Sequence, residues 1–162
     1  VRFVVAGDMS LTRSLPGRLG EVARRGGTLR DYAEVMGVAD MFLFLGHVQD
    51  PESVLVACHV LVKPTREYNP WGRDILEALA MGRPVISVGT YNRFVEHNRT
   101  GLLFSEYRAE EFARGIAYLA DNPDSLSEMG EEAARRVRLL CKGPARAADL
   151  VAFWEHAFTM AC

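Results

Sequence analysis

The residues with the clearest chemical character stand in NPWGRDILEA, residues 69–78. Gly72 and Arg73 directly precede a helical apolar pattern, and Glu77 follows one turn inside it. A helix N-terminus offers unpaired backbone N–H groups and a positive dipole end, which suit a phosphate or another anion. Gly72 lets the backbone approach a ligand, and Asn69 and Glu77 can accept hydrogen bonds from hydroxyl groups. Together these residue types suit a sugar attached to a phosphate.

A structural interpretation of the same stretch stays open from the residues alone. Asn69 would then form a turn, Pro70 would lead into the helix, and Trp71 would cover the core. The residue types alone are compatible with both this interpretation and ligand binding.

The charged residues around the loop also have two interpretations. On a helical wheel Glu77 lies opposite the apolar face and near Arg73, so it is solvated, paired with Arg73, or facing a cleft that another domain closes. A surface pair of this kind contributes only about 0.2–0.5 kcal/mol. Arg66, Glu67 and Arg73 flank the loop, where they would meet a phosphate or pair with one another.

Composition narrows the classes of function. The net charge of −2 gives no basic surface for nucleic acid and no polybasic membrane patch. The three cysteines are widely spaced and lack zinc-ligand spacing, so we expect no metal site and a reducing cytoplasm. No apolar run approaches the roughly 20 residues of a membrane span. The dinucleotide fingerprint GxGxxG, the P-loop motif, the zinc-protease motif HExxH and the hydrolase motif GxSxG are absent from the sequence.

Strand-like and helical segments alternate, which predicts a Rossmann-like three-layer α/β domain with a mostly parallel sheet. The expected strands are 2–7, 41–46 (buried), 59–64, 84–89 and 100–104. The expected helices are two pieces between 11 and 36 separated at Gly26–Gly27, then 51–58, 72–82, 109–121, 124–141 and 145–160. Ligands of such sheets bind beyond the carboxyl ends of the strands, where the loops containing Gly46, His47 and residues 69–73 are expected.

The ordered motifs from LFLGHVQD through LEALAMGRPVISVG to NRTGLLF resemble the C-terminal, nucleotide-sugar-binding domain of retaining GT-B glycosyltransferases of family 4, also called group 1. The resemblance implies that residues 1–162 form a single donor-binding domain of a longer protein. The N-terminal acceptor domain and the first strand–helix unit would lie outside this sequence. The implied activity is transfer of a hexosyl group from a nucleoside diphosphate sugar to an acceptor hydroxyl, in polysaccharide or glycolipid synthesis.

The resemblance also implies roles for individual residues. Glu77 falls on the glutamate that binds the ribose, and Gly72 on the glycine beside the donor phosphate and sugar. The donor site would comprise a set of eight residues: Asn69, Pro70, Trp71, Gly72, Arg73, Glu77, Gly46 and His47. The last two belong to the loop that receives the nucleobase. The donor is a substrate, so no cofactor and no metal are expected, and no catalytic residue can be assigned.

Three departures from the family pattern accompany the resemblance. Asn69 stands where the family has a glutamate that holds donor-sugar hydroxyls, and GTYNRFVE replaces the usual Gly-Gly after the fourth strand. The family's Arg and Lys that neutralise the diphosphate would lie ahead of Val1. The chain alone is therefore expected to be inactive. A GT-B-type nucleotide-sugar epimerase and a non-catalytic flavodoxin-like module remain as alternatives, and the full-length enzyme is expected in the cytoplasm, peripheral to the membrane at most.

Overall fold

The computed structural model of the chain describes residues 1–65 and 68–160. The chain divides into two compact units, Val1–Val54 and Leu55–Cys162, and the boundary falls inside helix α3 (Pro51–Ala57). The named strands pair in parallel, so the expected α/β class is confirmed. Within the described residues these strands form two sheets, one in each unit. The assignment of 1–162 to a single domain stays a prediction.

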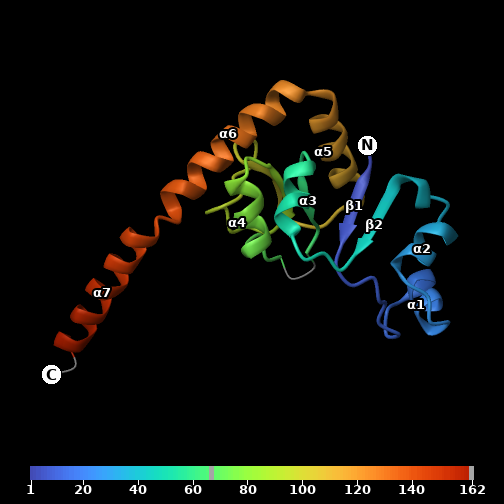
Figure 1. The fold of residues 1–162 in the computed structure, drawn as a ribbon, viewed down its shortest axis with the longest axis horizontal. Helices are drawn as coiled ribbons and strands as arrows, with labels where there is room; N and C mark the ends of the chain where they lie inside the picture. Colours follow the sequence, from blue (N-terminus) through green and yellow to red (C-terminus); the bar gives the residue numbers. More distant parts are fainter. Residues whose placement is uncertain (66–67, 161–162) are drawn as a thin grey trace. The chain divides into compact units, whose positions relative to one another are not determined.

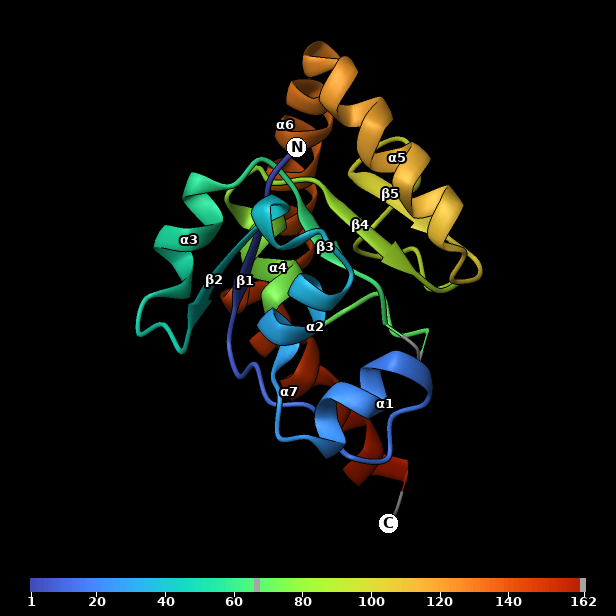
Figure 2. The same cartoon turned by 90° about the vertical axis from the view of Figure 1, so that its right-hand side faces the viewer.

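The first unit contains two neighbouring parallel strands and the helices that connect them (Figures 1 and 2). Its elements in chain order are β1 (Phe3–Ala6), α1 (Gly17–Arg24), α2 (Leu29–Val35), the 3-10 helix η1 (Ala39–Met41) and β2 (Phe42–Gly46). The expected break at Gly26–Gly27 separates α1 from α2. Helix α2 begins with a capping box, in which Thr28 N donates to Asp31 Oδ2 at 2.6 Å and Asp31 N donates to Thr28 Oγ1 at 3.5 Å.

Strand β2 is covered on one face only. The ring of Phe42 stacks on those of Phe3 and Phe44, with centroids 5.1 and 5.6 Å apart. Leu43 and Leu45 point to the other face and are 55% and 39% exposed. The prediction of a buried strand was therefore wrong, because no residue of β2 is buried and only alternate residues are half-buried. Although all residues of β2 but the last are apolar, their exposure alternates along the strand, because side chains of successive strand residues point to opposite faces.

The second unit is built on a parallel three-stranded sheet with β4 in the middle. Its strands are β3 (Leu61–Lys63), β4 (Val85–Val88) and β5 (Gly101–Phe104). Every residue of β4 is buried. Val85 joins a cluster with α4 (Arg73–Ala80), whereas Ile86 and Val88 join a second cluster with α5 (Ala109–Asp121). The sheet thus has an apolar layer on each face, as a doubly covered parallel sheet requires.

Helix α4 packs by the face that its apolar residues define. Ile75, Ala78 and Leu79 are completely buried, at the i, i+3 and i+4 spacing of one helical stripe. The helix ends in a Schellman motif, because Gly82 N donates to Leu79 O at 3.0 Å and Arg83 N donates to Ala78 O at 2.8 Å. The expected closure of this helix by Gly82 is confirmed.

Two long helices end the chain, α6 (Pro123–Leu140) and α7 (Gly143–Met160). Helix α6 contributes residues to both apolar clusters of the second unit. Only two residues separate it from α7, which continues along nearly the same line (Figure 1). The expected interruption at 143–144 is thus shorter than predicted, since Gly143 already lies in the helix. None of the described helices has the length and apolarity that a membrane crossing demands.

Candidate functional site

The beginning of helix α4 leaves its first backbone N–H groups without a side-chain cap. Gly72 is the N-cap residue, and its carbonyl accepts a hydrogen bond from Leu76 N at 3.0 Å. Its backbone angles, φ 149° and ψ 170°, lie in a region that is almost restricted to glycine. A glycine has no side chain to turn back onto the helix. The N–H groups of the first turn are therefore available to an anion.

Glu77 lies on the side of α4 that faces away from the sheet. Its carboxylate Oε1 is 3.0 Å from Arg73 Nε, with exposed side-chain fractions of 25% for Glu77 and 85% for Arg73. The pairing of Glu77 with Arg73 that the helical wheel offered is therefore present. Arg73 holds the glutamate at one oxygen, which leaves acceptor positions of the carboxylate for hydroxyl groups.

A second ion pair lies under the same turn. Lys63, the last residue of β3, places Nζ 2.8 Å from Asp74 Oδ1 and 3.5 Å from Trp71 O. A Cβ built on Gly72 would lie 2.9 Å from Lys63 Nζ and 2.7 Å from Asp74 Oδ1. Gly72 is thus required twice, by its backbone angles and by the pair packed against it. Lys63 was not among the predicted site residues.

The loop before α4 is supported by the loop after β4. Pro70 is fully buried, and Trp71, which a structural interpretation would place over the core, is 53% exposed. Gly89, with φ 139°, lies so close that a Cβ there would be 2.6 Å from both Pro70 Cδ and Tyr68 O. Tyr68 itself has φ 51°, an uncommon angle for a residue with a side chain. The absence of a side chain at Gly89, directly after β4, therefore allows the chain to pass close by at residues 68–70.

Asn69 carries an unsatisfied group in this loop. Its Oδ1 is buried and has no hydrogen-bond partner within the described part of the chain. A buried amide oxygen without a partner is destabilising by about 1–3 kcal/mol. A water molecule or a ligand could supply the missing partner.

The predicted site residues fall in both units. Residues 69–73 and Glu77 are brought together around the first turn of α4. Gly46 and His47 belong to the first unit: Gly46 has φ 70° and accepts a hydrogen bond from Gly7 N at 2.7 Å, and His47 is exposed. Arg66 and Glu67 lie outside the described residues.

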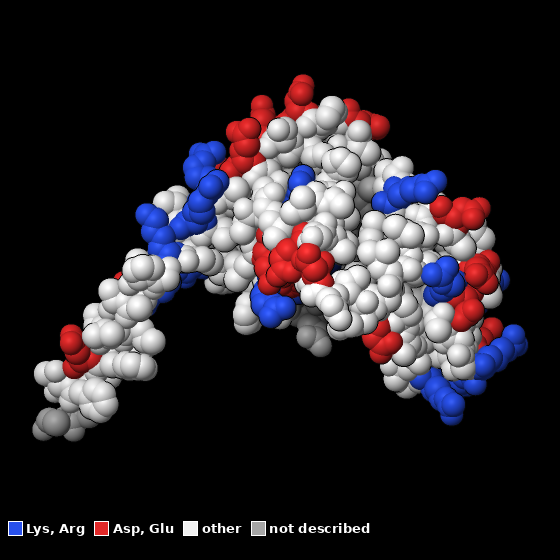
Figure 3. Space-filling model, viewed as in Figure 1, with Lys and Arg blue, Asp and Glu red and all other residues white. Residues whose placement is uncertain are grey.

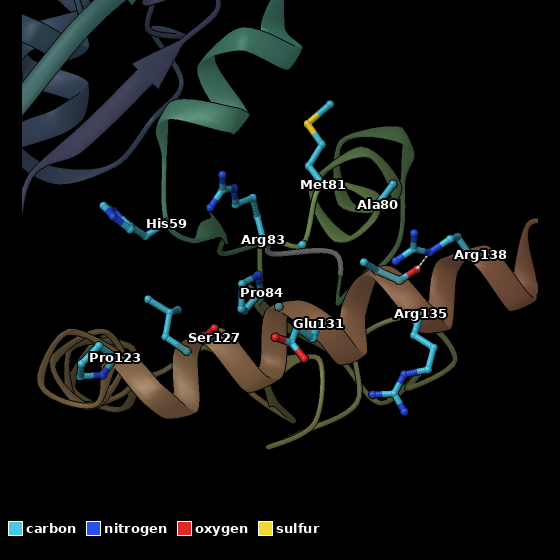
Figure 4. A pocket seen from close by; sticks show the side chains of 14 residues that line it. His59, Ala80, Met81, Arg83, Pro84, Pro123, Ser127, Glu131, Arg135 and Arg138 are labelled. Carbon is cyan, nitrogen blue, oxygen red and sulfur yellow. Dashed lines mark hydrogen bonds between the residues drawn. The ribbon is translucent and has the colours of Figure 1, made fainter.

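A cavity of about 930 Å³ lies elsewhere, between the C-terminal end of α4 and helix α6 (Figure 4). Its arginines are engaged with protein groups: Arg83 donates to Val56 O at 2.9 Å, Arg138 donates to Ala134 O at 3.1 Å, and Arg135 pairs with Glu132. The labelled arginines do not converge on a common point (Figure 4). Arg83 Nε is nevertheless buried without a hydrogen-bond partner among the described residues, so this guanidinium is only partly satisfied.

The charge distribution agrees with the small net charge. Acidic and basic side chains lie intermingled on the face drawn in Figure 3. The described residues contain no group of histidine, cysteine, aspartate and glutamate side chains that could hold a metal ion.

Known proteins resemble this chain in sequence. The family described as glycosyl transferases group 1 matches residues 1–122. An alpha-D-kanosaminyltransferase of Streptomyces kanamyceticus is 31% identical over 135 residues, which is 82% of this chain and 32% of that protein. The chain thus spans about a third of the length of this curated relative.

Solved structures resemble it in fold. A sucrose-phosphate synthase of Thermosynechococcus elongatus aligns with a TM-score of 0.74 at 25% identity, over 97% of this chain and 38% of that one. Anabaena HepE, in complex with UDP-glucose, aligns with a TM-score of 0.70 at 21% identity, over 92% of this chain and 40% of that one. The expected GT-B type of domain is confirmed by this agreement. With the family match over most of its length, the chain belongs to the group 1 glycosyltransferases.

Proposed function

We propose that this chain is the donor-binding part of a glycosyltransferase that moves a hexosyl group from a nucleoside diphosphate sugar to an acceptor hydroxyl, with retention at the anomeric carbon. The observation that carries the proposal is the first turn of α4. There an uncapped helix end and a glycine with φ 149° are followed by the carboxylate of Glu77 in the next helical turn. These groups match the phosphate, the close backbone approach and the hydroxyls of such a donor.

Each residue receives a role in this arrangement. The N–H groups after Gly72 would bind the diphosphate, and Glu77 would accept hydrogen bonds from the ribose hydroxyls. Asn69 Oδ1, which has no hydrogen-bond partner among the described residues, would accept one from a hydroxyl of the donor sugar. The loop of Gly46 and His47 would receive the nucleobase. The donor is itself the substrate, so the proposal includes no cofactor and no metal.

The chemistry breaks the bond between the anomeric carbon and the diphosphate oxygen and forms a bond from that carbon to the acceptor oxygen. The diphosphate leaves with the bonding electrons, and its departing oxygen takes up the proton that the acceptor hydroxyl releases. Positively polarised N–H groups at the start of α4 favour this step, because negative charge on the diphosphate increases as it departs. Placement of the donor beside the acceptor lowers the barrier further.

The acceptor would be a glycan or glycolipid bound by an N-terminal domain of the full-length protein, in the cytoplasm and peripheral to the membrane. HepE, a structural neighbour, was solved with UDP-glucose, which supports a nucleotide-sugar donor. The comparisons offer no support for an epimerase or a flavodoxin-like module.

Calorimetric titration of the 162-residue chain with UDP, GDP and ADP tests the proposal. We expect one nucleotide to bind, and Glu77→Gln to weaken it by about 1–3 kcal/mol, because a hydrogen bond to a charged group contributes about that much. Glu110→Gln, at an exposed glutamate in the first turn of α5, is the matched control and should bind like wild type. If no nucleotide binds up to millimolar concentration, or if the two variants behave alike, the assignment is wrong.

A further inference from the structure

Lys63 occupies an unusual position for a surface lysine. It is one of two lysines in the chain, and it stands at the carboxyl end of β3, where ligands of parallel sheets bind. Its ammonium is directed under the first turn of α4, 2.8 Å from Asp74 Oδ1 and 3.5 Å from Trp71 O. The side chain of Lys63 is 29% exposed, whereas that of Asp74 is 49% exposed.

Asp74 poses an electrostatic problem for the proposed site. A carboxylate in the first turn stabilises a helix, because it interacts with the positive end of the dipole. The same negative charge repels an anionic ligand that approaches that end. A diphosphate bound at the N–H groups after Gly72 would therefore meet Asp74 at short range unless a cation neutralised it.

The geometry places that cation where it is needed. A Cβ on Gly72 would lie 2.9 Å from Lys63 Nζ and 2.7 Å from Asp74 Oδ1, so the ion pair packs directly against the cap residue of the helix. The contact of Nζ with Trp71 O ties the same ammonium to the peptide that precedes Gly72. Lys63 thus touches both the charge that opposes an anion and the backbone that would receive it.

We propose that Lys63 is a positioning residue for the donor diphosphate, which neutralises Asp74 and holds the Trp71–Gly72 peptide so that the first-turn N–H groups of α4 accept the anion. This inference rests on the proposed function. It assigns to β3 a positive charge that acts through Asp74 and the loop, without contact to the donor.

The test is a charge cycle on the 162-residue chain. The nucleoside diphosphate that binds wild type, among UDP, GDP and ADP, and its matching nucleoside are titrated into Lys63→Met, Asp74→Asn and the double variant. We expect Lys63→Met to weaken the diphosphate about tenfold. We expect Asp74→Asn to bind it at least as tightly as wild type, and the double variant to recover most of the loss. The affinity for the nucleoside should not change in any variant, because the nucleoside carries no phosphate.

Controls separate this role from a purely structural ion pair. Lys142→Met removes the other lysine, which is exposed, and should bind like wild type. A structural pair predicts that Lys63→Met and Asp74→Asn weaken binding alike, and that outcome overturns the inference. Unchanged affinity in Lys63→Met overturns it too, while the proposed function stands. Failure of wild type to bind any nucleoside diphosphate removes both. Asp74→Asn decides the matter even if Lys63→Met fails to fold.

Discussion

Helix α4 has two ends of opposite character. At its C-terminal end the backbone groups are satisfied within the chain, through the bonds of Gly82 N to Leu79 O and of Arg83 N to Ala78 O. At its N-terminal end Gly72 supplies no side-chain cap, and charged or exposed residues surround the turn. Each end depends on a glycine with positive φ, 68° at Gly82 and 149° at Gly72. Gly82 allows the last carbonyl groups of the helix to be hydrogen-bonded, whereas Gly72 leaves the first N–H groups without a side-chain cap.

The contrast indicates that the C-terminal end of α4 contributes to stability and that the N-terminal end is suited to binding. The closed end packs on α6, where a Cβ on Gly130 would lie 2.4 Å from Gly82 O. At the open end the first N–H groups of the helix have no side-chain cap, and Asn69 Oδ1 has no hydrogen-bond partner among the described residues. Lys63 and Asp74 form an ion pair beside them. Substitutions at the two ends should therefore change different quantities.

The largest effect is expected for Gly72→Ala. An alanine at φ 149° is strained, and its Cβ collides with the Lys63–Asp74 pair, so the turn must shift. We expect nucleoside diphosphate affinity to fall by about 10- to 100-fold, or about 1.4–2.8 kcal/mol, in a calorimetric titration. Gly143→Ala is the control, because nothing lies within 4 Å of its Cβ position. Equal affinity in Gly72→Ala and wild type would show that this end of α4 is not the donor site.

A smaller effect of another kind is expected for Gly82→Ala. The left-handed angle of 68° disfavours a residue with a Cβ, and the nearest neighbour, Gly130 O, is 3.4 Å from that position. We expect the free energy of unfolding in urea to fall by about 1–2 kcal/mol. Nucleotide affinity should stay at the wild-type value under native conditions. A loss of affinity as large as that in Gly72→Ala would erase the distinction between the two ends.

The smallest effect extends the comparison to the beginning of α2, which is closed by a carboxylate. Backbone and side-chain hydrogen bonds from Thr28 hold the pKa of Asp31 below its ordinary value of 3.8. Because the folded-state pKa is lowered, the carboxylate stabilises the fold above pH 3.8, and this contribution is lost as the pH falls through the folded-state pKa. The difference in unfolding free energy between wild type and Asp31→Asn should therefore shrink on acidification below pH 3.8. A difference independent of pH would rule out this linkage.

Local patterns predicted much of the fold. Helix α5 covers 109–121 as expected, because its apolar spacing and the Asn122–Pro123 break both mark its bounds. The pairing of Arg73 with Glu77 also follows from helix geometry alone, since residues four apart lie on the same side of a helix. Such features depend on neighbours along the chain, which the sequence displays directly.

Other features depend on which distant segments meet. The role of Lys63 arises only when the end of β3 lies against the start of α4, and that contact has no signature in the spacing of the residues. The exposure of Leu43 and Leu45 likewise depends on what covers each face of β2. The residue types did offer a signal for the ion pair, because a lysine ends an apolar strand and an aspartate lies in the first turn of the following helix.

The close approach of Gly89 to Pro70 and Tyr68 O has a consequence for sequence change. Because a Cβ at position 89 would lie 2.6 Å from both, a side chain there can be accommodated only if the loop through residues 68–70 also changes. A variant library that randomises residues 68–73 to alter sugar preference should therefore include position 89. At position 89 alone, with residues 68–70 unchanged, we expect few substitutions to be tolerated.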